Sequence, residues 1–202
     1  MKLYYAPGAC SLSPHIVARE AGIPIELEKV NLADHQTETG QDYMTINPKG
    51  YVPALRFDDG SILTEGPAIV QYLADQKPAS GLAPAAGTLE RYRLQEWLTF
   101  IGTELHKSLG SLFNPATPEA VKETTKTNVA KRLAYLNGQL ANRQYLLGST
   151  FTVADAYAFT VVNWTNFLGI DLKAYPHLTV YMGRVGGRPK VQEALKAEGL
   201  VK

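Results

Sequence analysis

Strand-like patterns occupy only the first third of this chain, and this feature restricts its fold more than any other. Residues 2–6 (KLYYA) form a short aromatic-rich run, and within residues 25–30 Ile25 and Leu27 alternate with Glu26 and Glu28, the period of a half-buried strand. Residues 46–66 hold two more strand patterns joined at Asp59-Gly60, a strong hairpin signal. After the linker-like residues 78–86 (PASGLAPAA), only helical periodicity follows. The sequence therefore predicts a small α/β domain followed by an all-helical domain.

Capping residues mark where the helices should begin and end. Ser11 or Ser13 is expected to cap a first helix, which ends at Gly22. A second helical period covers residues 66–76, after the hairpin. In the later part of the chain, a long helical pattern covers residues 88–113. Further helices are expected to begin at Thr117-Pro118, Tyr175-Pro176 and Arg188-Pro189. Another is expected to begin at Thr152, which forms a capping box with Asp155.

The composition excludes several classes of partner and site. Twenty basic and nineteen acidic residues leave a net charge of +1, which makes no case for nucleic acid or an anionic membrane as partner. One cysteine cannot form an internal disulfide, and no apolar run approaches the roughly 20 residues of a membrane span. No His, Cys and Asp cluster has metal-ligand spacing, so we expect no metal. These observations predict a soluble protein of the cytoplasm.

The only cysteine, Cys10, lies between the first strand and the first helix. As a small apolar side chain it could simply fill space. At a helix N-terminus, however, the dipole and the unpaired backbone N–H groups lower the pKa of a thiol and make it reactive. Position 13 is Ser, so no thioredoxin-type Cys-x-x-Cys pair exists. The location favours a functional thiol.

Two motifs at the hairpin allow both a structural and a functional interpretation. Pro53 opens the third strand, where a proline is common; with a cis bond before it, the Val52 backbone would be able to pair with an extended peptide. Glu65 suits the first turn of the following helix, and the N–H groups of Glu65 and Gly66 could instead hold a ligand carboxylate.

In the long helical pattern, Thr99, Thr103 and His106 fall at i, i+4 and i+7, with Gly102 and Gly110 expected on the same side. A stripe of small and hydroxyl side chains indicates a groove, beside which His106-Lys107 places a titratable ring and a cation. A tight contact between helices or between two copies of the chain explains the stripe equally well. We expect His15 and His177 to be surface or capping residues.

Together these segments resemble a glutathione S-transferase, most closely of the bacterial beta class, over essentially the whole chain. The resemblance is carried by MKLYYAPGACSLSPHIVAREAG at the start, NPKGYVPAL, LTEGPAIVQYLAD, ELHK at 104–107 and TVADAY. It implies a thioredoxin-like, glutathione-binding domain at 1–79 and an all-helical domain at 87–202, which carries the electrophile pocket and dimer contacts. The expected assembly is a homodimer.

The resemblance also assigns roles to single residues. Cys10 lies near the glutathione sulfur, and His106 lies near the thiols; these two are the expected catalytic residues. The Val52 backbone, held by cis-Pro53, pairs with the cysteinyl part of glutathione. The remaining expected glutathione-binding residues are His35 at the glycyl carboxylate, Glu65 and Gly66 at the γ-glutamyl end, and Thr99, Thr103, Glu104 and Lys107 around the site, some of them across the dimer.

Three positions depart from the pattern of the class. Position 35 is His rather than Lys, so the carboxylate contact should weaken above about pH 6.5, where an unperturbed imidazole loses its proton. Position 66 is Gly rather than a hydroxyl residue, and position 99 is Thr rather than Asn. These changes predict modest glutathione affinity.

Three functions follow from the resemblance. The first is conjugation of the glutathione thiolate to electrophilic, largely apolar small molecules. The second is glutaredoxin-like thiol-disulfide exchange through a mixed disulfide between Cys10 and glutathione. The third is a non-catalytic, ligand-carrying dimer of the same fold, for which a degraded thiol site would be expected. The set Cys10, Pro53, Glu65 and His106 favours an enzyme, in which glutathione is the co-substrate.

Overall fold

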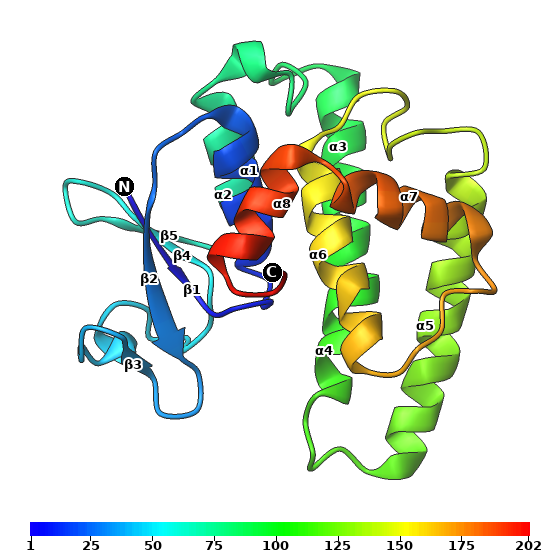
Figure 1. The fold of residues 1–202 in the computed structure, drawn as a ribbon, viewed down its shortest axis with the longest axis horizontal. Coiled ribbons are helices and arrows are strands. Elements are labelled where there is room, and N and C mark those ends of the chain that lie inside the picture. The colour runs from blue at the N-terminus through cyan, green and yellow to red at the C-terminus, as the bar shows by residue number, and fades with distance from the viewer. The chain divides into compact units, whose positions relative to one another are not determined.

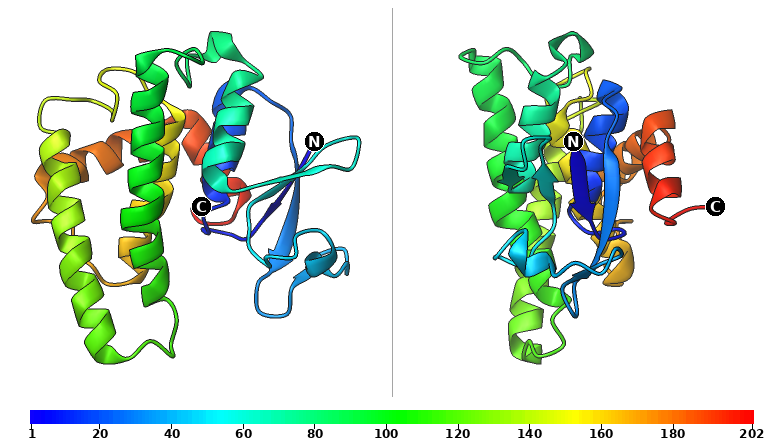
Figure 2. Two further views of the ribbon diagram at one scale, coloured as in Figure 1. Left: turned by 180° about the vertical axis from the view of Figure 1, so that it is seen from behind. Right: turned by 90° about the vertical axis from the view of Figure 1, so that its left-hand side faces the viewer.

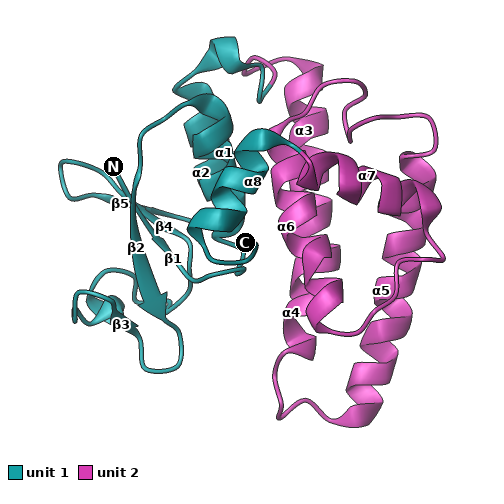
Figure 3. Ribbon diagram, in the orientation of Figure 1, with its two compact units in different colours: residues 1–83, 188–202 teal, residues 84–187 magenta.

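A computed structural model describes residues 1–202, which form two compact units (Figure 3). Unit 1 comprises residues 1–83 and 188–202, and unit 2 comprises residues 84–187. The expected fold class is confirmed, with a mixed α/β unit and an all-helical unit. One segment is grouped differently from the expectation: residues 188–202 pack with unit 1. The domain ranges 1–79 and 87–202 stay a prediction.

Unit 1 is built on a five-stranded sheet in the order β3-β2-β1-β4-β5 (Figure 1). The central strand β1 runs parallel to β2 and antiparallel to β4, and β5 and β3 add antiparallel edges. The short β3 comprises only two residues. The strands are β1 (Lys2–Tyr5), β2 (Glu26–Asn31), β3 (Gln36–Thr37), β4 (Ala54–Arg56) and β5 (Ile62–Thr64).

Helices α1 (Leu12–Ala21) and α2 (Gly66–Asp75) pack side by side against one face of this sheet (Figure 2), and α8 (Pro189–Ala197) packs against α1. Two short 3₁₀ turns, Tyr43–Thr45 and Pro78–Ser80, complete the unit. On the other face, Tyr4 and Ala54 pack with Tyr43 and Val52 in a buried cluster. Side chains alternate along β1, so Leu3 and Tyr4 serve opposite faces.

The two ends of α1 test the capping that the sequence predicts. Gly22 ends the helix with a positive φ of 64°, which glycine adopts without steric cost. Ser11 occupies the N-cap position as expected, but its side chain makes no capping hydrogen bond. The Ser11 hydroxyl instead accepts from the Ala6 N–H at 3.1 Å and donates to the Ala6 carbonyl at 3.2 Å, and the Ser13 hydroxyl donates to the Cys10 carbonyl at 2.8 Å. Both hydroxyls therefore hold the loop after β1 rather than the helix end.

Unit 2 is entirely helical. Its central helix, α6, is buried along most of its length, and α3, α4 and α7 pack against it, while α5 packs against α4 and α7. A π-helical segment, Ile101–His106, joins α3 to α4, so the long helix expected at 88–113 is interrupted. No helix of the chain is both long and apolar enough to cross a membrane. The helices are α3 (Leu89–Phe100), α4 (Lys107–Leu112), α5 (Glu119–Gln139), α6 (Val153–Phe167) and α7 (Pro176–Gly186).

Helix α5 begins one residue later than expected. Pro118 was predicted as the first helical residue after a Thr117 cap, but its ψ of 145° is not helical, and Pro118 itself is the N-cap. The Thr117 hydroxyl donates to the Ser111 carbonyl at 3.0 Å and is thereby held away from the helix start. The predicted starts of α7 and α8 at Pro176 and Pro189 are confirmed.

The capping box at the start of α6 is confirmed and lies fully inside unit 2. Asp155 accepts hydrogen bonds from the Thr152 N–H at 2.8 Å, the Thr152 hydroxyl at 2.9 Å, the Leu146 N–H at 2.9 Å and the Tyr181 hydroxyl at 3.0 Å. Burial raises the pKa of Asp155 to about 6, although these bonds act to lower it. Asp155 thus joins three segments of the unit at one carboxylate.

This raised pKa predicts a pH dependence of stability. The folded chain binds the Asp155 proton more tightly than the unfolded chain, so between pH 3.8 and about 6 the folded state carries more protons. The free energy of unfolding should therefore contain a component that falls as pH rises through this window, by about 3 kcal/mol in total. Urea unfolding of the parent and of Asp155→Asn, at pH 4 and at pH 6.5, measures it as a difference in pH slope.

Equal pH slopes for the two proteins would contradict this assignment. If Asp155→Asn does not fold, the carboxyl ¹³C shift of Asp155 in the parent still reports its titration directly, and a midpoint near pH 3.8 would be the contradicting result.

Candidate functional site

Sheet topology brings four predicted site segments to one end of the sheet in unit 1. Strands β1 and β2 are parallel, so the loops after them, which carry Cys10 and His35, leave from the same end. Strand β4 is antiparallel to β1, so Val52-Pro53, just before β4, lies at that end too. Strand β5 reverses direction once more, which places Glu65 and Gly66 there. Residues far apart in sequence are thus gathered in one region.

The Cys10 thiol contacts the Val52 segment directly. Its Sγ donates a hydrogen bond to the Val52 carbonyl at 3.0 Å. Cys10 is partly exposed, whereas Val52 is buried with 5% of its surface accessible. The thiol precedes α1 by two residues, close to the N-terminal end of that helix. The location inferred from the sequence is therefore observed, and the thiol is oriented toward Val52 rather than into the core.

The Val52–Pro53 peptide bond is cis, as the resemblance implied and contrary to the simpler interpretation of a strand-opening proline. Gly66 packs beside this segment: a Cβ at Gly66 would lie 3.9 Å from Pro53 Cγ and 3.9 Å from Ser13 Oγ. Since the Ser13 hydroxyl also bonds the Cys10 carbonyl, Cys10, Pro53 and Gly66 form one continuous patch.

Glu65 has a backbone conformation that side chains rarely adopt, with φ of 71°. Its carbonyl accepts the N–H groups of Ala68 and Ile69 and so begins α2. Its carboxylate is exposed and pairs with Lys49 Nζ at 2.6 Å, while the same ammonium donates to Thr64 Oγ1 at 3.0 Å. Glu65 therefore presents a negative charge beside Gly66, with Lys49 as its neighbour.

His35 packs against the backbone that leads to Val52. A Cβ at Gly50 would lie only 2.9 Å from His35 Cε1 and 3.2 Å from Met44 Sδ, so only glycine fits there without movement of the ring. His35 itself has a positive φ of 56°, and its carbonyl accepts the Tyr43 N–H at 2.7 Å. Its Nδ1 is buried and has no hydrogen-bond partner. The ring is thus held by packing.

In unit 2, the His106 ring packs against aromatic side chains of α6. Its Nδ1 is 2.6 Å from the Tyr157 hydroxyl, and its ring meets Trp164 edge-on with centroids 4.9 Å apart. Phe113 contacts the same tryptophan at 5.8 Å. Tyr157 and Trp164 are seven residues apart on α6 and so project from one side of that helix.

The stripe expected around His106 is confirmed only in part: a Cβ at Gly110 would lie 3.9 Å from His106 Cδ2 and one at Gly102 3.5 Å from the Tyr157 hydroxyl, so both glycines lie beside this aromatic cluster. Thr99 and Thr103 are exposed, and the Thr103 hydroxyl donates back to the Thr99 carbonyl at 2.9 Å. Glu104 pairs with Arg132 on α5 at 2.6 Å, and Lys107 is exposed. The π-helical segment has a wider turn than an α-helix, and this shifts His106 out of phase with the threonines.

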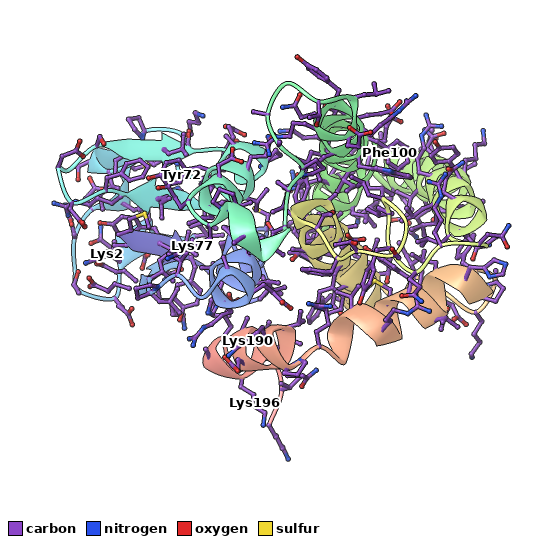
Figure 4. All side chains as sticks on the ribbon, turned by 90° about the horizontal axis from the view of Figure 1, so that it is seen from above. Lys2, Tyr72, Lys77, Phe100, Lys190 and Lys196 are labelled. Atoms are coloured by element: carbon purple, nitrogen blue, oxygen red, sulfur yellow. The ribbon has the colours of Figure 1, made fainter.

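A hollow of about 940 Å³ lies in unit 2 along α3 and α5. Trp97, Phe100 and Tyr135 form its aromatic part, with Phe100 and Tyr135 centroids 5.2 Å apart. Phe100 lies on α3 in Figure 4. The hollow includes Glu104 and Arg132 but not His106. It is therefore separate from the aromatic cluster on α6.

Four residues that contact the predicted site were not indicated as site residues by the sequence patterns. Lys49 pairs with Glu65, Ser13 holds Cys10, and Tyr157 and Trp164 contact His106. Lys49 and Tyr157 stand inside the quoted segments NPKGYVPAL and TVADAY, which was the available signal. His15, expected at the surface or as a cap, is fully buried, whereas His177 is exposed. No group of three or more His, Cys, Asp or Glu side chains is placed to hold a metal ion.

Comparison with known proteins identifies the family. A model described as the glutathione S-transferase N-terminal domain matches residues 8–76, and one described as the C-terminal domain matches residues 100–189. The chain is 48% identical over 200 residues to glutathione S-transferase GstA of Escherichia coli O157:H7, covering 99% of this chain and 100% of that protein.

Two solved structures are similar over 100% of both chains. One is a sphingomonad glutathione S-transferase complexed with glutathione, with a TM-score of 0.96 and 51% identity. The other is a bacterial beta class glutathione S-transferase of Sphingomonas chungbukensis, with a TM-score of 0.96 and 50% identity. The chain therefore belongs to the glutathione S-transferase family, in its bacterial beta class.

Proposed function

We propose that this protein conjugates the thiol of glutathione to electrophilic, largely apolar small molecules. The observation that carries the proposal is the patch in unit 1, where the Cys10 thiol, the backbone at cis-Pro53 and Gly66 adjoin the Glu65 carboxylate. Glutathione is the co-substrate, and the sphingomonad relative is a complex with this tripeptide. Family membership supports the enzymatic function over a non-catalytic carrier.

The patch matches the polar groups of a γ-glutamyl tripeptide. The Val52 backbone pairs with the cysteinyl part, the Glu65 carboxylate attracts the free amino group, and His35 attracts the glycyl carboxylate. The Val52 carbonyl already accepts the Cys10 thiol at 3.0 Å, so a bound peptide N–H has to share or replace that bond. Lys49 beside Glu65 offers a positive charge to the γ-glutamyl carboxylate.

In the reaction, the glutathione sulfur loses its proton and attacks the electrophilic carbon. A carbon–sulfur bond forms, and the leaving group departs with its electron pair, or an epoxide ring opens. The enzyme lowers the barrier by holding the sulfur as a thiolate and by orienting it. We assign this stabilisation to the N-terminal end of α1, Cys10 and His106, with Thr99, Thr103, Glu104 and Lys107 as further predicted binding residues.

Calorimetric titration with glutathione, followed by a panel of aryl halides, epoxides and chlorinated acids, tests the proposal. We expect saturable binding and turnover of at least one apolar electrophile. A mixed-disulfide substrate is assayed beside the panel, because exchange chemistry would use the same patch. A folded protein that binds no glutathione at millimolar concentration would refute the proposed function.

His35 gives this binding site a predicted pH dependence. If the imidazolium binds the glycyl carboxylate, glutathione affinity should fall as pH rises and the ring loses its proton. His35→Lys keeps the positive charge at higher pH and should tighten binding while removing this part of the pH profile. Calorimetry between pH 5.5 and 8 measures both effects, and identical profiles for the two proteins would exclude the role.

We also propose a homodimer, supported by the two-domain resemblance and by the exposed Thr99 and Thr103 on one helix face. Light scattering at micromolar concentration should give about twice the chain mass of 22.1 kDa. A mass near that of a single chain would contradict it. A cytoplasmic location stays a prediction based on the single cysteine.

A further inference from the structure

The hydrogen bond between His106 and Tyr157 is short and well enclosed. The Tyr157 hydroxyl is 2.6 Å from His106 Nδ1, and Tyr157 is only 2% exposed. The two rings meet at 68° with centroids 5.8 Å apart, while Trp164, 7% exposed, contacts the imidazole edge-on at 81°. His106 Nδ1 is thus hydrogen-bonded to a residue of α6, and the packing limits rotation of the imidazole.

Two local devices produce this contact. The Thr152–Asp155 capping box fixes where α6 begins and therefore which side of the helix Tyr157 occupies. The π-helical segment ends at His106 and turns this residue toward α6. Gly102, in the same segment, lies beside the phenol: a Cβ there would be in ordinary van der Waals contact with the Tyr157 hydroxyl, at 3.5 Å. Segments of this kind occur often at functional sites.

The chemistry of the two groups decides which one donates. A phenol O–H is a stronger donor than the N–H of a neutral imidazole, and the unprotonated ring nitrogen is a stronger acceptor than a phenol oxygen. Tyr157 therefore donates to Nδ1, and the proton of the neutral ring lies on Nε2. We propose that Tyr157 is a positioning residue that fixes His106 as the Nε2–H tautomer, so that His106 acts as a hydrogen-bond donor and not as a base.

This inference rests on the proposed function only in its consequence for turnover. A thiolate accepts a hydrogen bond from an Nε2–H group, whereas an Nε2 lone pair would repel it. Without the Tyr157 hydroxyl, the ring can adopt either tautomer, and part of the donor function is lost. We expect Tyr157→Phe, which keeps the aromatic ring, to lower kcat/KM for an activated aryl chloride about ten-fold, the scale of one hydrogen bond to a charged group.

The first test reads the tautomer without any substrate. Long-range ¹H–¹⁵N correlation spectra of the histidine-labelled protein distinguish a protonated from an unprotonated Nδ1, and His106→Gln assigns the signal among the four histidines. We expect an unprotonated Nδ1 in the parent near neutral pH and a tautomer mixture in Tyr157→Phe. A protonated Nδ1 in the parent would overturn the proposal, whether or not the variant folds.

The second test is a double-mutant cycle in conjugation. Because Tyr157 acts through His106, Tyr157→Phe should have no further effect in a His106→Ala background. An equal ten-fold loss in both backgrounds would show that Tyr157 acts on its own and would overturn the proposal. Tyr175→Phe is the matched control in unit 2: the Tyr175 hydroxyl donates to the Ala130 carbonyl at 3.2 Å, and its removal should leave the NMR signal and turnover unchanged.

Should glutathione neither bind nor react, the proposed function fails and the cycle has no activity to read. The NMR result still stands in that case, because it depends only on His106 and Tyr157. The two failures are therefore distinguishable.

Discussion

Cys10→Ala should abolish any thiol-transferase activity of this protein while lowering glutathione conjugation only in part. In exchange chemistry, the Cys10 thiolate attacks a disulfide sulfur, a mixed disulfide forms and the other thiolate leaves. No other cysteine can replace it. In conjugation the attacking sulfur belongs to glutathione, so Cys10 assists through one contact. Losing a contact of about 1–3 kcal/mol corresponds to a reduction of roughly 5- to 150-fold in rate.

Cys10→Ser separates these two roles. The serine hydroxyl can still donate to the Val52 carbonyl, which accepts the parent thiol at 3.0 Å, but it cannot form a disulfide. Conjugation by Cys10→Ser should therefore exceed that of Cys10→Ala, while both variants lack mixed-disulfide turnover. Both assays are run on the same preparations, and circular dichroism checks that the fold is retained.

Two results would contradict this division of roles. Complete loss of conjugation in Cys10→Ala, with glutathione still bound, would mean that Cys10 does more than assist. Unchanged mixed-disulfide turnover in the same variant would mean that Cys10 only fills space and is not the nucleophile.

Glu198→Ala should give the largest loss of stability. Glu198 follows α8, and its buried carboxylate accepts the Gly8 N–H at 2.9 Å and contacts His15 Nδ1 at 2.9 Å. Arg19 donates to His15 Nε2 at 3.3 Å, so that nitrogen is an acceptor and the proton lies on Nδ1, toward Glu198. Removing the carboxylate removes two hydrogen bonds to a buried charge, one from the buried His15 ring and one from the half-buried Gly8 N–H. Because a hydrogen bond to a charged group contributes about 1.5–3 kcal/mol, we expect the free energy of unfolding to fall by about 3–5 kcal/mol.

For a chain of this length, such a loss lowers the melting temperature by about 10 °C, which calorimetry and urea unfolding both measure. Glu193→Ala is the matched control. Glu193 lies on α8, near half exposed, and pairs with Lys190 at 2.7 Å, a side chain visible on that helix in Figure 4. Its loss should stay within about 0.5 kcal/mol. A melting temperature of Glu198→Ala within 2 °C of the parent would refute the assignment.

The consequence for the site comes through the loop that carries Cys10. Gly8 lies two residues before the thiol, and the Ser11 hydroxyl one residue after it bonds Ala6. The loop before Cys10 is therefore held by two contacts. Glu198, after α8, bonds the Gly8 N–H, and the Ser11 hydroxyl bonds the Ala6 backbone. Residues 188–202 group with unit 1 because α8 packs against α1 and Glu198 bonds Gly8 and His15.

The sequence by itself determined the order of the elements and the features that depend on near neighbours. The turn at Asp59-Gly60, the end of α1 at Gly22 and the capping box of Thr152 with Asp155 all rest on residues a few positions apart. Steric and capping preferences act over such distances, so a pattern in the sequence specifies them. The five quoted segments, taken together, were sufficient to indicate the family.

Only the tertiary structure decided which of these segments meet and which way their side chains point. The partner of His15 stands 183 positions away, so no local pattern could predict that this histidine is buried. Thr99 and Thr103 are exposed whereas His106 contacts Tyr157 and Trp164, because a π-helical segment changes the helical phase before His106. The patch of Cys10, Val52 and Gly66 exists because strand directions bring their loops to one end of the sheet, and strand pairing is a property of the folded chain.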